Sequence, residues 1–269
     1  MSESLSFFVM QLSLIAVVLV LHVYLGLHII RRTIIFCDLA LDQLAALGAL
    51  AGIGIGISYG SVHSYFLSLI AVIFGALLLA VIKPSGRSVP QEAVIGIMYA
   101  LALVGSLLLG DKLAGGGAYV TKTLSGSMLW VSWRLIFVTA LVYVLLLIFH
   151  YHFRDRFLAL ADGEHDRLWD FLFFTTQGII TVLIVPIAGV LLAYSFLMIP
   201  AAISLMFTRG WMRGVLVGWI VGFAACALGL VVSYYGNFPY GPTLILALGL
   251  FFLCAVIVRF LMPAGNRSR

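Results

Sequence analysis

The chain has 269 residues, of which 64% are hydrophobic and 9% are charged, and its mean hydropathy is +1.20. This composition excludes a soluble globular domain. The formal net charge of +5 does not indicate nucleic-acid binding, because the basic residues lie in short segments between apolar runs, where such residues orient membrane spans.

Apolar runs of membrane length occur along the whole chain. A run of about 20 residues crosses a hydrocarbon core of about 30 Å, and eight such runs lie near residues 5–30, 33–58, 62–82, 91–110, 129–150, 168–192, 212–235 and 241–261. Within lipid, only helices satisfy the backbone hydrogen bonds of runs this long and uniformly apolar. The sequence therefore predicts an all-α, polytopic membrane protein, with one transmembrane domain over residues 1–269 and lipid around it.

A shorter apolar stretch at 195–208 decides between eight and nine spans. If it crosses the membrane, the basic clusters all fall on one side, which is then the cytoplasmic side, and the N-terminus lies outside. If it is a re-entrant or surface helix, eight spans remain and the basic loop 150–167 is harder to place. Composition leaves both counts open.

Two acids interrupt the second span. Asp38 and Asp42 are four residues apart, which separates them by only about 40° around a helix. Each costs about 2.5–3.5 kcal/mol near a bilayer centre, and such acids are usually paired or line a pathway. A structural hydrogen bond and a cation pathway both explain the pair. Gln43 adds a carbonyl oxygen beside Asp42, and oxygen ligands suit hard and borderline divalent cations.

Glycine occurs in two kinds of pattern. Gly48, Gly52 and Gly56 repeat every four residues on the side of the second span that carries the acids, and small residues at this spacing let another helix approach closely. We therefore expect them to serve helix packing. The Gly- and Thr-rich segment 111–127 is expected to be a flexible connector at a membrane surface.

The remaining polar residues are weaker candidates. Glu92 opens the fourth span, where an acid either complements the helix dipole or lines a pathway, and His63 lies at the mouth of the third. We treat both as pathway or gating candidates. His150, His152 and His165 would bind a metal only from an extended loop, because residues i and i+2 do not share a helical face.

The chain lacks the phosphate loop that binds ATP and the HExxH motif of zinc proteases. The lysines are Lys83, Lys112 and Lys122, and none follows a glycine, so the chain has no GxxxxGK[ST] phosphate loop for ATP. HExxH is absent as well. The chain is expected not to be an enzyme and to hold no permanent cofactor.

Four segments, in order along the chain, resemble segments of one known family, the permease subunits of ATP-binding-cassette importers for zinc, manganese and iron. The first is the second-span segment GLHIIRRTIIFCDLALDQLAALG at 26–48. The others are QEAVIGI at 91–97, AGVLLAYSFLMIPAA at 188–202 and SYYGNFPYGP at 233–242. These three are similar to the family's ExAIGI, AGVLLVxxLLIxPAA and SYxxxxPxGP segments. The resemblance covers about residues 20–260.

This resemblance implies a homodimeric pore in the bacterial cytoplasmic membrane. A separate cytoplasmic ATP-binding subunit would drive it, and an extracytoplasmic metal-binding protein would supply the divalent metal, which is zinc or manganese in preference to iron. The segment that contains Ala188, Gly189, Pro200 and Ala201 would form or adjoin the contact with the ATPase. The resemblance also favours eight full spans over nine.

One departure affects the expected ligands. The family's second-span motif is DALSHxxLPG, and aligning its Gly on Gly48 places Gln43 at the His position, Asp42 at the Ser position and Leu39 at the Asp position. Asp38 and Asp42 restore a pair in shifted register, with oxygen in place of imidazole. We predict that Asp38, Asp42 and Gln43 are transient metal ligands. The alternative is an autonomous proton-coupled secondary transporter of a small solute, with the same acids as a proton relay.

Overall fold

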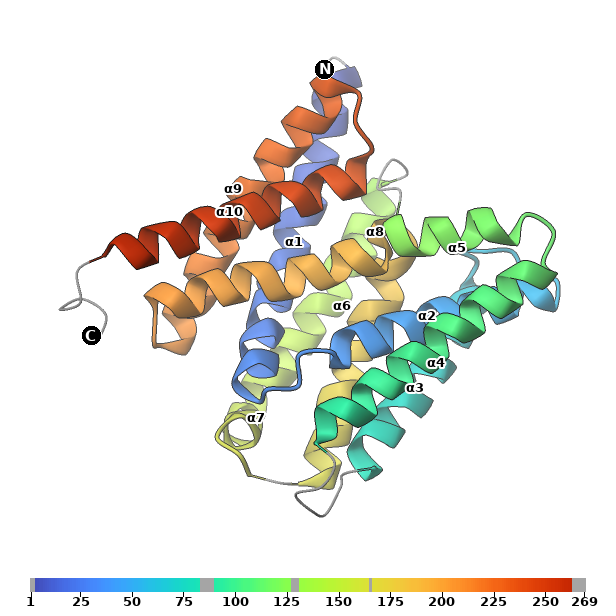
Figure 1. The fold of residues 1–269 in the computed structure, drawn as a ribbon, viewed down its shortest axis with the longest axis horizontal. Helices are drawn as coiled ribbons and strands as arrows, with labels where there is room; N and C mark the ends of the chain where they lie inside the picture. Colours follow the sequence, from blue (N-terminus) through green and yellow to red (C-terminus); the bar gives the residue numbers. More distant parts are fainter. Residues whose placement is uncertain (1–2, 83–89, 127–130, 165, 263–269) are drawn as a thin grey trace.

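The computed structural model describes residues 3–82, 90–126, 131–164 and 166–262 (Figure 1). Within these ranges the regular structure is entirely helical. In chain order the helices are α1 (Glu3–Arg31), α2 (Cys37–Gly54), α3 (Val62–Val81), α4 (Gln91–Lys112), α5 (Gly116–Ser125), α6 (Trp133–His152), α7 (Arg154–Ala161), α8 (Arg167–Phe207), α9 (Trp211–Gly236) and α10 (Tyr240–Leu261). The all-α prediction is confirmed.

Eight of the described helices are long and apolar enough to cross a membrane, namely α1, α2, α3, α4, α6, α8, α9 and α10. Their positions match the eight runs expected from hydropathy. The helices α5 and α7 are shorter and join neighbouring spans. The count of eight spans is therefore confirmed within the described part of the chain.

Helix α8 explains the ambiguous stretch at 195–208. It has 41 residues, and a straight helix of that length would measure about 60 Å, twice the hydrocarbon thickness. Gly189 interrupts it with φ 77° and ψ 163°, a backbone conformation that glycine adopts readily. The two arms of α8 run in different directions (Figure 1). Residues 195–208 therefore belong mostly to the second arm and form no separate ninth helix.

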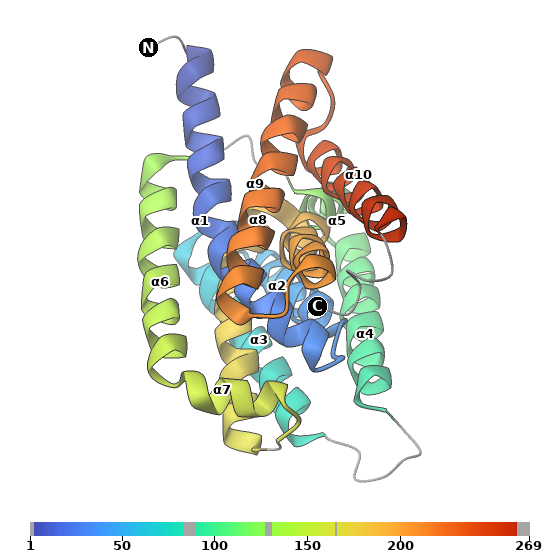
Figure 2. The same ribbon diagram turned by 90° about the vertical axis from the view of Figure 1, so that its left-hand side faces the viewer.

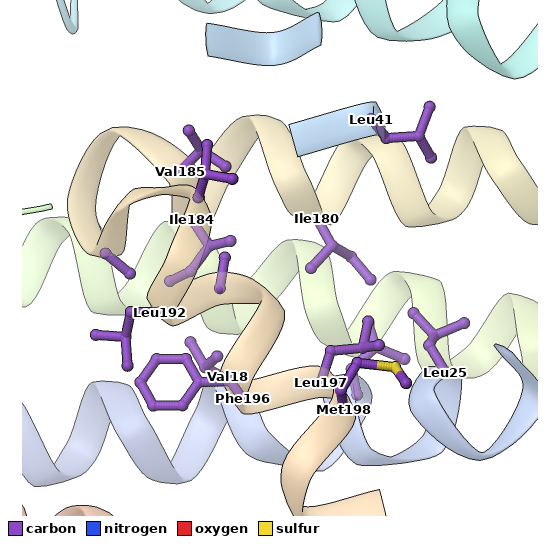
Figure 3. Packing of buried hydrophobic residues seen from close by; sticks show 14 of the residues in the cluster. Val18, Leu25, Leu41, Ile180, Ile184, Val185, Leu192, Phe196, Leu197 and Met198 are labelled. Atoms are coloured by element: carbon purple, nitrogen blue, oxygen red, sulfur yellow. The ribbon is translucent and has the colours of Figure 1, made fainter. Parts of the chain in front are cut away.

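The interior of the bundle is built around α2 and α8. Helix α8 packs against α1, α2, α3, α9 and α10, whereas α2 packs against α3, α4 and α8. Figure 2 shows both between α6 on one side and α4 on the other. Figure 3 shows the apolar core where α8 bends, with Val185 before the bend and Leu192 and Phe196 after it. Helices α4 and α10 are mostly exposed along their length and carry exposed apolar side chains.

Two of the three predicted packing glycines pack against α3. A Cβ atom at Gly48 would lie 2.8 Å from the carbonyl oxygen of Leu67, and one at Gly52 would lie 3.0 Å from the Leu67 side chain. The prediction that Gly56 serves helix packing is wrong, because α2 ends at Gly54 and Gly56 follows in a turn. Its φ is +86° and no atom lies within 4 Å of the position of its Cβ, so it serves chain reversal and not helix packing.

We predict that Gly48→Val destabilises the protein. The added methyl groups would push α3 away from α2, and overpacking of this kind costs about 1–3 kcal/mol or more. Gly249→Val in α10 is the matched control, because a Cβ there meets no atom within 4 Å. Thermal unfolding in detergent should show a lower midpoint for the first variant only. Equal midpoints would contradict the tight contact between α2 and α3.

The segment 111–127 also differs from expectation. It is not irregular throughout, because Gly116–Ser125 form α5, which packs against α4 and α8. Gly115 with φ 70° begins this helix and Gly126 with φ 66° ends it. Glycine therefore supplies the positive φ at both ends of a short helix.

Candidate functional site

The two acids of α2 face α8 in the interior of the bundle. Asp38 is 2% exposed and Asp42 is fully buried. The side-chain amide of Gln177 on α8 donates a hydrogen bond to Asp38 Oδ1. One turn further along, the hydroxyl of Thr181 lies beside the Asp42 carboxyl, although outside ordinary hydrogen-bonding geometry. Because both pairs are spaced i, i+4, the facing helices form two rungs, each of one carboxyl group and one neutral polar group.

Most oxygen atoms of this site have no hydrogen-bond partner within the described part of the chain. They include Asp38 Oδ2, both carboxyl oxygens of Asp42 and the amide oxygen of Gln177. The hydroxyl of Tyr143 on α6 is also unpartnered, and it lies within electrostatic reach of both acids. Buried polar atoms are normally hydrogen-bonded, so a cluster of exceptions indicates a place for a bound water or ion.

The charge of the site favours a cation as its ligand. Two carboxyl groups in a dry interior are costly unless a cation or protons neutralise them. The buried guanidinium of Arg32 is committed to Asp170 on α8. The site therefore offers two carboxylates with neutral amide and hydroxyl oxygens around them, the donor set that hard divalent cations accept.

Gln43 lies apart from these two rungs. Its amide nitrogen donates a hydrogen bond of 3.1 Å to the Ser106 hydroxyl on α4, and α4 packs against α2 without packing closely against α8. Its amide oxygen is buried and has no partner among the described residues. The structure thus brings Asp38 and Asp42 together on the α8 side, while the side chain of Gln43 is directed to α4. Its role as a ligand stays a prediction.

The members of the site on α8 and α6 were not predicted from the sequence. Gln177 and Thr181 are polar residues four apart in an apolar span, the same spacing as Asp38 and Asp42, and this was the available signal. Tyr143 carries no signal of its own, because tyrosine is common in membrane spans.

The two gating candidates have different environments. Glu92, in the first turn of α4, accepts a hydrogen bond of 2.9 Å from the backbone N–H of Phe36, directly before α2. Its other carboxyl oxygen is buried and unpartnered within the described residues. His63 lies in the first turn of α3 and is exposed. Glu92 therefore touches the helix that carries the acids, whereas no contact links His63 to them in the described structure.

Of the three histidines considered as metal ligands only His150 is buried in the described structure, and the expected ATPase segment is buried as well. His150 is buried and bonds the Thr176 hydroxyl at 2.9 Å, whereas His152 is exposed and His165 lies outside the described residues. No three His, Cys, Asp or Glu side chains in the described chain form a metal-binding group. The four residues expected in the ATPase segment are all buried within α8, and they are Ala188, Gly189, Pro200 and Ala201. In this conformation they offer no surface to a partner, and their coupling role stays a prediction.

The chain as a whole is similar to known membrane proteins of metal transport systems. A family model described as the ABC 3 transport family matches residues 6–259. The manganese transport system membrane protein MntC of Listeria innocua is 25% identical over 216 residues, which cover 76% of this chain and 75% of that protein. The chelated iron transport system membrane protein YfeD of Yersinia pestis is 25% identical over 205 residues, which cover 73% and 68%. A chain of the solved structure of PsaBC from Streptococcus pneumoniae in complex with Fab has the same fold, with a TM-score of 0.74 at 19% identity, over 96% of this chain and 93% of that one.

Proposed function

The chain belongs to the ABC 3 transport family, and from that premise we propose that it imports a divalent metal cation through the site formed by Asp38 and Asp42. As a permease of this family it is a multi-pass membrane protein of the bacterial cytoplasmic membrane. Alternating access moves the cation past the two acids, and the energy comes from ATP hydrolysed by another subunit. Membership in this family argues against an autonomous proton-coupled transporter.

The observation that carries the proposal is the pair of buried acids with three unpartnered oxygens. They are Asp38 Oδ2 and both oxygens of Asp42, in a fully buried part of α2. A structural role for the pair would have given these oxygens donors, as Asp170 has in Arg32. A transient cation site needs them free between transport cycles.

Manganese is the cation that this donor set fits best. Carboxylate, amide and hydroxyl oxygens suit Mn²⁺, whereas zinc is commonly held by imidazole or thiolate. The thiol nearest to the site is Cys37, which is fully buried beside Asp38. The names of the relatives MntC and YfeD refer to manganese and chelated iron, and both support a cation of this class over zinc.

The proposal requires partners outside this chain. A cytoplasmic ATP-binding subunit supplies the energy, because the sequence has no phosphate loop. An extracytoplasmic metal-binding protein delivers the cation, and two copies of this permease form the pore. No permanent cofactor takes part, since the metal is the transported substrate.

Reconstitution tests the proposal. The permease is co-purified with the cytoplasmic ATP-binding subunit, incorporated in proteoliposomes and supplied with the metal-binding protein and ⁵⁴Mn²⁺. ATP-dependent uptake is expected, and it should be lost when the ATPase carries a substitution in its phosphate loop. A permease that purifies without any ATPase and moves the cation down a proton gradient would overturn the proposal.

Gln177→Leu should weaken uptake by raising the apparent KM for Mn²⁺. A hydrogen bond to a charged group contributes about 1.5–3 kcal/mol, which corresponds to about tenfold or more in affinity. Thr176→Val is the matched control, because Thr176 lies on the same turn of α8 but bonds His150. Uptake measured against Mn²⁺ concentration should show the shift for Gln177→Leu alone. An unchanged KM would remove Gln177 from the site.

A further inference from the structure

The chain between α1 and α2, here called the elbow (residues 32–36), is a strained connection. Thr33 has φ 54°, a left-handed conformation that costs a residue with a Cβ atom about 1–2 kcal/mol. The backbone N–H of Ile34 donates a hydrogen bond to the carbonyl of Ile29. This bond spans six residues and is typical of the motif that ends many helices. Glycine is the usual residue at such a position. Contacts from elsewhere must therefore hold the elbow in this shape.

The first of these contacts is a buried ion pair. The guanidinium of Arg32 meets the carboxylate of Asp170 on α8, with their side chains 7% and 3% exposed. Arg32 also lies over the rings of Phe173 at 4.8 Å and Phe174 at 5.5 Å. A pair shielded in this way is strongly coupled, because removing one partner leaves an uncompensated buried charge. It ties the first residue of the elbow to α8.

The second contact ties the last residue of the elbow to α4. Glu92 accepts the hydrogen bond from the N–H of Phe36, one of the N–H groups that a helix leaves unsatisfied at its start. An acid in this place also complements the helix dipole. The cap comes from a different helix, so the start of α2 is held between α8 and α4.

The elbow lies between the carboxylate site and the basic end of the bundle. Cys37, the next residue, is within electrostatic reach of Arg32, Asp38 and Glu92 together. On the other side, Arg31 bonds the carbonyl of Arg209. Helix α7, with its own arginines, packs against α1 and α8 at this end. The positive-inside rule assigns such an end to the cytoplasm.

We propose that the elbow is the cytoplasmic gate of the pathway and that Arg32, Asp170 and Glu92 are the positioning residues that keep it closed. This inference rests on the proposed function, because it assumes that the cation leaves Asp38 toward the cytoplasm. In the closed state the charge of Arg32 and the held start of α2 block that exit. Movement of α8 against α2 breaks the ion pair, and the strained elbow then swings α2 and its carboxylates toward the cytoplasm.

Cys37 is a native probe of this gate, because it is fully buried and directly follows the elbow. Inside-out membrane vesicles that contain the permease and its ATPase are treated with a membrane-impermeant maleimide, and labelling is read by peptide mass spectrometry. Arg32→Gln with Asp170→Asn removes both charges of this ion pair. We expect labelling of Cys37 to rise about tenfold or more, because a buried ion pair can favour the closed elbow over the open one by that factor.

Three controls separate gate opening from loss of structure. Cys226 in α9 is fully buried and should stay unlabelled in the same sample. Arg154→Gln with Asp155→Asn removes an exposed ion pair of 3.5 Å and should leave Cys37 protected. Glu92→Gln keeps the acceptor for Phe36 and should also protect Cys37, whereas Glu92→Leu should expose it.

Protection of Cys37 in both the charge-pair variant and Glu92→Leu, at wild-type levels, would overturn the gate. Labelling of Cys226 together with Cys37 would overturn it as well, because it would show a general loosening of the bundle. The thiol measurement needs no metal transport, so it can fail while ATP-driven uptake is intact. Absent uptake with the expected labelling pattern would contradict the proposed function, and it would show that the elbow opens without serving a cation pathway.

Discussion

Asp38→Asn combined with Asp42→Asn is expected to abolish ATP-driven uptake of Mn²⁺. The loss should exceed about 100-fold, since even partners outside the first ligand sphere of a metal contribute 10–100-fold in affinity or activity. Asn keeps the size of each side chain, so α2 should keep its packing against α8. Initial rates of ⁵⁴Mn²⁺ uptake in proteoliposomes measure the effect, and co-purification of the ATPase shows that the variant is folded.

The matched control removes the same number of negative charges from the surface. Asp111 and Asp155 are exposed, with 78% and 91% of their side-chain surface accessible. Their replacement by Asn should leave the uptake rate near that of the wild type. Wild-type uptake by the variant at 38 and 42 would refute a ligand role for both acids.

Asp42→His should shift the preference of the importer from manganese toward zinc. The substitution creates an Asp and a His four residues apart on the face of α2 that meets α8, and imidazole suits zinc better than carboxylate does. We expect about a tenfold change in the ratio of zinc to manganese uptake, which corresponds to about 1.4 kcal/mol. Competition between ⁶⁵Zn²⁺ and ⁵⁴Mn²⁺ in the same vesicles measures this ratio.

Gln43→His is the informative control for this experiment. Alignment of the second-span motif on Gly48 would place the family's His at residue 43, yet the side chain of Gln43 is directed to Ser106 on α4. A His there should leave the ratio of zinc to manganese unchanged. A shift with Gln43→His and none with Asp42→His would mean that the pathway lies on the α4 side of α2.

Hydropathy located the eight spans, because each is a long helix that the bilayer forces to satisfy its own hydrogen bonds, but it left open whether 195–208 is a ninth. The bend at Gly189 was not predictable in the same way. A single glycine in an apolar run leaves no trace in hydropathy, and only the left-handed φ at that residue shows that 195–208 follows a bend in α8. Gly56 failed as a packing residue for a related reason, since the i, i+4 pattern continued in the sequence after α2 had ended.

The acids of the site could be recognised from their energetic cost alone, and the structure places Asp38 and Asp42 on one buried face, as predicted. Their partners on α8 could not be recognised in this way. Gln177 and Thr181 lie about 140 residues further along, and the register between α2 and α8 is set by tertiary packing that a single sequence does not reveal. Glu92 was identified as a gating candidate, but its contact with Phe36 depends on how α4 meets the start of α2.

The cation site at Asp38 and Asp42 is tested most directly by counting the Mn²⁺ ions that the permease binds with both acids intact and with both changed to Asn. Electron paramagnetic resonance of the free ion, during titration of the complex in nanodiscs, counts the bound ions. The wild type should bind one Mn²⁺ per permease chain, and the double variant should lose this ion. An equal number of bound ions in the two proteins would contradict a cation site at the two acids.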